Sequence, residues 1–193
     1  MSYSPNLRVV IVNGRPGSGK TTFEMLCMRE MGGQAFCQMR STVDRVKEIA
    51  AQVGWVGTKE LKDRKFLSDL KDLFTEYNDM PFNDVCKYLE KWENTLKYYK
   101  ADDLPHLFFI DDREPEHIER LKKKLNAITL LVRRPGDTTA ETSNHADAEV
   151  FQYHYDCVID NNGTVEDFKK DAKDFIDLLW SDKYNLLKEK VEE

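Results

Sequence analysis

The segment over residues 14–21 constrains this chain more than any other. It reads GRPGSGKT and matches the pattern of a glycine, any four residues, a glycine, a lysine, and a serine or threonine. The preceding run, RVVIVN at residues 8–13, is short and β-branched, which is typical of a buried parallel strand, and a helix is predicted over residues 20–31. A strand, this glycine-rich loop and a helix, in that order, predict a backbone turn that holds an anion with its N–H groups and the helix start. A glycine-rich turn without a ligand is the alternative interpretation.

The loop motif assigns candidate roles to its own side chains. Lys20 is placed to bridge the β and γ phosphates of a nucleotide, and the Thr21 hydroxyl is placed to ligate a magnesium ion. ATP and Mg²⁺ are therefore the predicted cofactors. The predicted phosphate-binding residues are Gly14, Arg15, Pro16, Gly17, Ser18, Gly19, Lys20, Thr21 and Thr22.

Strands and helices alternate along the rest of the chain. Further strands are predicted over residues 34–39, 106–110, 128–132 and 156–159. Helices are predicted within residues 42–99, where Pro81 precedes a helix over 82–99, and over residues 116–125 and 165–179, the last closing the chain. This alternation predicts a three-layer α/β/α arrangement around a five-stranded parallel sheet. Together with the glycine-rich loop motif, it predicts an α/β fold of the P-loop NTPase type.

A single domain over residues 1–193 is predicted. Its core takes in residues 6–40 and 104–182, and a helical insert over residues 41–100 lies where an acceptor-binding subdomain is expected. The polar stretch between residues 134 and 150 is long for a loop and is predicted to be a lid. Ligands are expected at the carboxyl ends of the strands.

Charge and hydropathy exclude some classes of partner. The net charge is −6, from 29 basic and 35 acidic residues, so there is no overall positive field to hold a duplex nucleic acid. No apolar run approaches the roughly 20 residues that span a bilayer, and the amino terminus shows no signal-peptide pattern. The four cysteines are isolated from one another, which indicates free thiols. We therefore expect a cytoplasmic monomer or homodimer that binds small-molecule nucleotides, without a membrane or duplex nucleic acid as partner.

Two charged pairs follow predicted strands. Asp111 and Asp112 come directly after the apolar strand HLFFI, where either carboxylate could organise the magnesium ion, and Asp111 is the preferred candidate. A helix cap or a turn before Pro115 is the alternative role. Arg133 and Arg134 end the fourth strand, where guanidinium groups can neutralise charge on a transferring phosphoryl group or form a solvated basic pair.

The insert and the lid carry further charged candidates. Arg45, Lys47, Arg64 and Lys65 lie in the helical insert and could contact an acceptor, although a solvated helix face explains them as well. His145 lies in the polar segment SNHADAE, either as an acceptor or lid contact or as an exposed loop histidine. Their roles depend on which of them reach the phosphate loop.

With these residues in place, the chain resembles the P-loop nucleoside monophosphate kinases, and among them the phage-type deoxynucleoside monophosphate kinases. The segment DDREP at residues 111–115 is similar to a family strand ending in aspartate, any residue and arginine, with a proline two further on, which implies that Arg113 is a phosphate ligand. The chain is also similar in a strand that ends in Arg133, in a lid histidine (His145) followed closely by an acidic residue, and in NNGT at residues 161–164 before the last predicted helix.

The insert adds a further similarity to this family. Residues 43–70 are similar to its acceptor region, which implies that Asp44, Lys47 and Arg64 face an acceptor nucleotide. The candidate acceptor-binding residues are Asp44, Lys47, Arg64, Arg134 and His145. Ser68 and Lys71 stand where the family pattern has a glutamine and later a glycine, so the base of the acceptor stays open.

The residues and the resemblance together predict an ATP- and Mg²⁺-dependent phosphotransferase that acts on a nucleoside monophosphate, deoxynucleotides included. Lys20, Arg113 and Arg133 are the candidates for stabilising phosphoryl charge, while Thr21 and Asp111 are the candidates for organising the metal. Two alternatives remain open: a kinase of another small phosphorylated metabolite, and a nucleotide-binding regulatory module without transfer activity.

Overall fold

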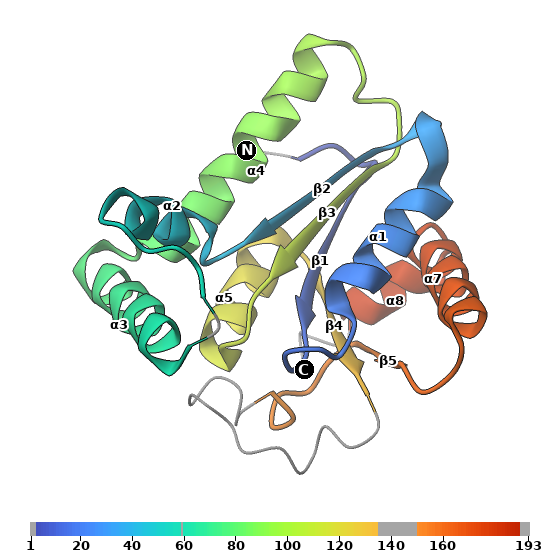
Figure 1. Ribbon diagram of the computed structural model, residues 1–193. Coiled ribbons are helices and arrows are strands. Elements are labelled where there is room, and N and C mark those ends of the chain that lie inside the picture. Colours follow the sequence, from blue (N-terminus) through green and yellow to red (C-terminus); the bar gives the residue numbers. More distant parts are fainter. Residues whose placement is uncertain (1–2, 59, 135–149, 190–193) are drawn as a thin grey trace.

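The described residues of the computed structural model, 3–58, 60–134 and 150–189, form a five-stranded parallel sheet between two layers of helices (Figure 1). The strands are β1 (Leu7–Asn13), β2 (Phe36–Ser41), β3 (His106–Asp111), β4 (Ile128–Arg133) and β5 (Cys157–Asp160). Their order across the sheet is β2-β3-β1-β4-β5, and each neighbouring pair is parallel. The predicted α/β fold, with a five-stranded parallel sheet between layers of helices, is therefore confirmed.

The central strands are apolar on both sides because helices cover both faces of the sheet. Val10, Val12 and Phe109 belong to the hydrophobic cluster on one face, while Val9 and Ile11 belong to the cluster on the other. All of these side chains are 2% exposed or less. This double burial is why the strands are near-continuous hydrophobic runs in the sequence.

Helices from both halves of the chain cover the sheet. One layer contains α1 (Lys20–Met31), α7 (Val165–Leu179) and α8 (Lys183–Glu189), and the other contains α4 (Met80–Tyr98) and α5 (Pro115–Leu125). α1 packs on α7 through Phe23, whose ring centroid lies 5.2 Å from that of Phe168 and 5.6 Å from that of Phe175. Leu89 of α4 and Ile118 of α5 are fully buried in the opposite layer.

Two helices lie beyond the carboxyl end of β2. α2 (Asp44–Gln52) and α3 (Leu61–Asn78) pack on each other, on the opposite side of the molecule from α7 (Figure 1). Both fall in the range predicted as the acceptor-binding insert. α4 falls in that range too, but its Val85 and Leu89 pack against the sheet in the same cluster as Val9.

Two of the differences from the predicted element boundaries have a local cause. β2 begins at Phe36 instead of residue 34, because Gly32–Gln34 forms a 3₁₀ turn, η1, after the end of α1. α4 begins at Met80 and includes Pro81 in its first turn, whereas the prediction placed Pro81 before the helix. Proline fits there because the first N–H groups of a helix have no acceptor within it.

The chain continues past α7, which was predicted to close it, into the short helix α8. Tyr184 of α8 is 2% exposed, and the Arg8 guanidinium lies 4.5 Å from the centroid of its ring. Arg8 Nε also donates a hydrogen bond to the Leu179 carbonyl at 2.8 Å. A helix this short has little stability of its own, so its contacts with the core define it and local periodicity does not predict it.

The predicted lid, residues 134–150, lies outside the described residues except at its ends, Arg134 and Val150. The lid and the contact by His145 therefore stay predictions. No helix in the described ranges is long and apolar enough to cross a membrane.

Asp156 connects the start of β5 to β4 and α5 through buried polar contacts. Its Oδ1 accepts a hydrogen bond from Lys122 Nζ at 2.7 Å, and its Oδ2 accepts two from Thr129, from the backbone N at 2.8 Å and from Oγ1 at 2.9 Å. The side chains of Asp156 and Lys122 are each 9% exposed. Breaking such a pair is costly because the remaining partner stays buried without its counter-charge.

Asp156→Asn should lower the free energy of unfolding by about 2 kcal/mol, because the amide keeps the shape but cannot offer Lys122 a full negative charge. Urea denaturation followed by circular dichroism would measure the change. Asp160→Asn is the control, because Asp160 pairs with Arg133 on the surface, where the two side chains are 47% and 48% exposed. For this variant we expect the free energy of unfolding to fall by less than about 1 kcal/mol. Equal losses in the two variants would contradict the role assigned to burial.

Candidate functional site

The loop between β1 and α1 follows a backbone path that disfavours any side chain at two points. Gly14 has a φ of 150°, and a Cβ atom there would lie 2.2 Å from the carbonyl oxygen of Val132 on β4. Gly19 has a φ of 103°, and a Cβ atom there would lie 2.5 Å from Asn161 Nδ2. Both contacts are too close for a Cβ atom, so only glycine lets the loop lie directly against β4 and the turn after β5.

Two asparagine side chains hold this loop. Asn13 Oδ1 accepts a hydrogen bond from Gly14 N at 2.7 Å, and Asn13 Nδ2 donates to the Tyr155 hydroxyl at 2.7 Å. Asn161 Nδ2 donates to the Ser18 carbonyl at 2.8 Å. The sequence pattern predicted no role for Asn13; the available signal was a polar residue at the end of an apolar strand. Asn161 belongs to the NNGT segment, whose contact with the loop becomes visible only in the structure.

The start of α1 is open to an anion. Among the described residues, no side chain caps this helix, and its first turn contains no acidic residue. The first N–H groups therefore present partial positive charge. Lys20 adds a full charge, since its Nζ donates to the carbonyl oxygens of Gly14 at 2.5 Å and Arg15 at 3.2 Å and so lies over the loop. This arrangement can hold phosphate oxygens.

A cavity of about 850 Å³ opens beside this loop, between the carboxyl ends of the strands and helices α2 and α3. Among the described residues, seven basic and four acidic side chains line it, although the whole chain has a net charge of −6. The basic ones are Lys20, Arg40, Lys47, Arg64, Lys71, Arg113 and Arg134, and the acidic ones are Asp44, Asp111, Asp112 and Glu114. The excess of basic groups favours a ligand with several negative charges.

The structure brings most of the predicted site residues to this cavity. Those that line it are Pro16, Gly17, Gly19, Lys20, Thr21 and Thr22 of the loop and first turn, Asp44 and Lys47 of α2, Arg64 of α3, and Asp111, Arg113 and Arg134. Gly14, Arg15 and Ser18 are buried parts of the loop outside the lining. His145 lies outside the described residues.

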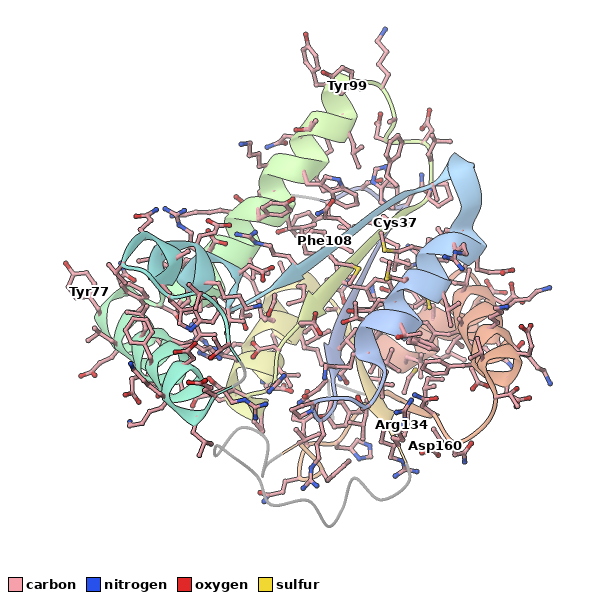
Figure 2. The ribbon with its side chains drawn as sticks, viewed as in Figure 1. Cys37, Tyr77, Tyr99, Phe108, Arg134 and Asp160 are labelled. Atoms are coloured by element: carbon pink, nitrogen blue, oxygen red, sulfur yellow. The ribbon has the colours of Figure 1, made fainter. Side chains whose placement is uncertain are left out.

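Arg133 is placed differently from its neighbour. Its guanidinium pairs with the carboxylate of Asp160, which lies directly opposite it in the β4–β5 register. Arg133 is not among the described residues that line the cavity, whereas Arg134 is. Successive side chains of an extended backbone point to opposite sides, so only one of two neighbouring arginines faces the cavity. Figure 2 shows Arg134 and Asp160 together at this end of the sheet.

Asp111 and Asp112 have different surroundings. Asp112 is 2% exposed, and its Oδ1 accepts hydrogen bonds from the backbone N of Arg113 at 2.7 Å and of Glu114 at 3.3 Å, which stabilises the turn before α5. Asp111 Oδ1 is buried without a hydrogen-bond partner in the described part of the chain. Burial raises the pKa of Asp111, while the charges of Lys20 and Arg113 lower it. Asp112 Oδ2 is also buried without a hydrogen-bond partner in the described part of the chain, but it lies 3.7 Å from His117 Nδ1. Asp111, on which the charge of Lys20 acts, is therefore the preferred carboxyl group for a cation beside the loop.

Lys71 links helix α3 to the turn after β3. Its Nζ lies 2.5 Å from Glu114 Oε1 and 3.8 Å from Asp112 Oδ1, and its side chain is 8% exposed. His117 Nδ1 lies 3.5 Å from Glu114 Oε2 and 3.7 Å from Asp112 Oδ2. In the sequence Lys71 was only a departure from the family pattern, because a lysine on a helix gives no sign of a distant carboxylate. This buried network positions α3 against the turn that carries Arg113.

A second hollow, of about 600 Å³, lies on the outer side of α4. It is lined by Lys87, Glu90, Lys91, Asn94, Thr95, Tyr98 and Tyr99. Figure 2 shows Tyr99 at the opposite end of the molecule from Arg134. The hollow is therefore far from the carboxyl ends of the strands, and the cavity beside the glycine-rich loop is the candidate functional site.

The oxygen groups beside the loop fit a magnesium ion. Thr21 and Asp111 both line the cavity, one with a hydroxyl and one with a carboxyl group. Within the described residues, no group of three or more His, Cys, Asp or Glu side chains could hold a metal ion by itself. Mg²⁺ suits such a site because it commonly uses one or two carboxylates together with water and the phosphates of a ligand.

Comparisons with known proteins give only distant similarity. No protein-family model matches the chain, and no curated protein matches it. Similar solved structures include a mutant of the APS kinase CysC of Mycobacterium tuberculosis, with 16% identity, a TM-score of 0.44, and coverage of 90% of this chain and 97% of that one. The same kinase in complex with AMPPNP and APS has 16% identity, a TM-score of 0.45, and coverage of 90% and 98%. TT1252 from Thermus thermophilus has 18% identity, a TM-score of 0.41, and coverage of 90% and 98%. Similarity at this level carries no argument about activity or substrate.

Proposed function

We propose that this chain is an ATP- and Mg²⁺-dependent phosphotransferase that acts on a nucleoside monophosphate, deoxynucleotides included. The observation that carries the proposal is the uncapped start of α1, beside a cavity lined mainly by basic side chains. The volume of about 850 Å³ lies in the range of small-molecule sites. The loop N–H groups and Lys20 would bind the phosphates of the donor, and the side formed by α2 and α3 would receive the acceptor.

Basic side chains supply the catalysis in this proposal by stabilising charge. During phosphoryl transfer, negative charge spreads over the oxygens of the transferred group, and positioning replaces any covalent intermediate with the protein. Lys20, Arg113 and Arg134 line the cavity and would neutralise this charge. A role for Arg133 stays a prediction, because its guanidinium would first have to leave Asp160.

Thr21 and Asp111 are the groups that would hold the magnesium ion. When bound, Mg²⁺ would neutralise charge on the donor phosphates. Thr21 lies in the first turn of α1 and Asp111 ends β3, so two regular elements fix these oxygens relative to the loop. Anchoring of this kind keeps both groups ready before a ligand arrives.

The insert would provide the acceptor side of the cavity. Asp44 is the first residue of α2, and Lys47 Nζ lies 3.4 Å from Asp44 Oδ1 one turn later. Arg64 reaches the same cavity from α3. Lys47 and Arg64 suit the phosphate of the acceptor, and the Asp44 carboxylate suits a hydroxyl or amino group of its sugar or base.

A coupled assay of ADP production, with ATP, Mg²⁺ and a panel of ribo- and deoxyribonucleoside monophosphates, tests this proposal. We expect ADP production that depends on one or a few members of the panel. Turnover only with another phosphorylated metabolite would favour a kinase of that metabolite. Nucleotide binding without acceptor-dependent turnover would favour a regulatory module and would overturn the proposal.

Arg64→Ala should raise the KM for the acceptor about 10-fold or more, because a charge-assisted hydrogen bond to a phosphate contributes roughly 1.5–3 kcal/mol. The KM for ATP should stay within about two-fold, since the donor phosphates would lie at the loop. Steady-state kinetics with each substrate varied in turn would measure both constants. Lys62→Ala is the control, because Lys62 is exposed on the same helix and does not line the cavity. Equal changes in both KM values for Arg64→Ala would contradict its place on the acceptor side.

A further inference from the structure

Glu24 is a buried carboxyl group that the proposed function leaves without a role. It lies on α1 three residues after Thr21, a spacing that places both side chains on the same face of the helix. Its side chain is 0% exposed, and neither of its carboxyl oxygens has a hydrogen-bond partner within the described residues. Burying a polar group unpaired costs roughly 1–3 kcal/mol, and more for a charge, so such a group calls for an explanation.

Two members of the candidate site act electrostatically on Glu24. The pKa of Glu24 is raised to about 8, first by burial and then by the negative charge of Asp111, and the positive charge of Lys20 opposes this rise. Asp111 has an unpaired buried oxygen of its own, Oδ1. Glu24 on helix α1 and Asp111 at the end of β3 are thus near enough for their charges to interact, and three of their four oxygens accept no hydrogen bond from the described part of the protein.

We propose that Glu24 is a metal-positioning residue that, together with Asp111, gives the divalent-cation site a second carboxylate. This inference rests on the proposed function, because the cation is the one that would accompany ATP at the loop. Two carboxylates in a buried site repel each other, and a divalent cation beside them offsets that repulsion. Mg²⁺ and Mn²⁺ both take oxygen ligands, and the Thr21 hydroxyl on the same face of α1 adds a third oxygen group.

The other buried acidic cluster of the site differs because basic side chains lie beside it. Asp112 and Glu114 already have Lys71 beside them, at 3.8 Å and 2.5 Å, and Asp112 Oδ1 accepts a backbone hydrogen bond from Arg113 at 2.7 Å. Their negative charge is therefore balanced by the protein itself. Asp112 Oδ2 also accepts no hydrogen bond from the described residues, but His117 Nδ1 lies 3.7 Å from it. The two oxygens of Glu24 and Asp111 Oδ1 are therefore the unpaired oxygens that we assign to the cation.

A cation site with two carboxylates should behave differently from a site that binds the cation only through the phosphates of a nucleotide. The protein should bind one divalent cation without nucleotide, because two carboxylates provide affinity before any phosphate is present. Binding to the folded state alone also stabilises it, so the cation should raise the melting temperature of the nucleotide-free protein. Both effects should depend on Glu24.

The test compares wild type, Glu24→Gln and Glu30→Gln, the last as a control because Glu30 is exposed on the same helix. Mn²⁺ binding to the full chain would be followed by electron paramagnetic resonance without nucleotide, and thermal melting would be measured in EDTA and in MgCl₂. Wild type and Glu30→Gln should bind Mn²⁺ and melt at higher temperature with Mg²⁺. Glu24→Gln should bind Mn²⁺ about 10-fold more weakly or worse, lose the Mg²⁺ shift, and melt no lower than wild type in EDTA.

Three results of these two measurements would each overturn the inference: wild type that binds no Mn²⁺, Glu24→Gln that binds it normally, or Glu24→Gln that melts lower than wild type in EDTA. The last result would identify Glu24 as a structural carboxyl group. Titration with a fluorescent ATP analogue, in EDTA and in MgCl₂, separates this inference from the proposed function. Failure of wild type to bind the analogue would refute the proposed function, while equal Mg²⁺ enhancement in wild type and Glu24→Gln would refute only the role of Glu24.

Discussion

Replacing Lys20 with alanine should reduce the rate of phosphoryl transfer about 1,000-fold or more, because the proposed reaction depends on positive charge placed at the phosphates before transfer. The ammonium group lies over the loop, bonded to the carbonyl oxygens of Gly14 and Arg15. Its loss removes the nearest full charge from a site that the backbone N–H groups polarise only partially. The measurement is acceptor-dependent ADP production at saturating ATP, compared between wild type and Lys20→Ala.

The fold should survive this substitution. Lys20 is half-buried at the cavity wall and lies outside the hydrophobic clusters on the two faces of the sheet. We expect the melting temperature of Lys20→Ala to stay within a few degrees of wild type, and Lys87→Ala, on the exposed side of α4, to leave both rate and melting unchanged. Near-normal transfer by folded Lys20→Ala would remove the loop from the mechanism.

Gly14→Ala should destabilise the protein by about 3 kcal/mol or more and abolish nucleotide binding. An added Cβ would lie 2.2 Å from the Val132 carbonyl oxygen and 2.8 Å from Ser18 Oγ, at a φ of 150°. The nearest obstacle is backbone in a central strand, which cannot move aside as a flexible side chain can. For a chain of 193 residues, such a loss corresponds to a fall in melting temperature of roughly 6–12 °C.

Gly33→Ala is the matched control for Gly14→Ala. Gly33 lies in η1, has no left-handed φ, and a Cβ there would meet nothing within 4 Å. We expect a change in stability of less than about 0.5 kcal/mol and unchanged binding of a fluorescent ATP analogue. If both glycine variants melted and bound nucleotide like wild type, the close approach of the loop to β4 would be wrong.

The fold was largely predictable because its signals are local. β1 and β3 are runs of large apolar residues, and the glycines of the loop mark conformations that other residues avoid. The prediction missed α8 and displaced the start of β2 by two residues, since burial of Tyr184 and the turn η1 depend on surroundings that periodicity does not record.

The candidate site was predictable only in part. The phosphate loop and the candidates Asp111, Arg113 and Arg64 could be named from motif and resemblance, and these three candidates line the cavity together with part of the loop. The pairing of Arg133 with Asp160 could not be foreseen, because it depends on the register of β4 and β5. The link between Lys71 and Glu114 joins residues 43 positions apart, which no local pattern connects.

By itself, the sequence determined that strands and helices alternate and that a glycine-rich loop joins the first strand to its helix, because hydrophobic period and glycine conformation act over a few residues. Only the tertiary structure decided which charged groups interact. It places Arg134 at the cavity, pairs Arg133 with Asp160, and buries Glu24 where the charge of Asp111 acts on it. Such partnerships depend on distances across the sheet and between layers, and these distances exist only once the chain has folded.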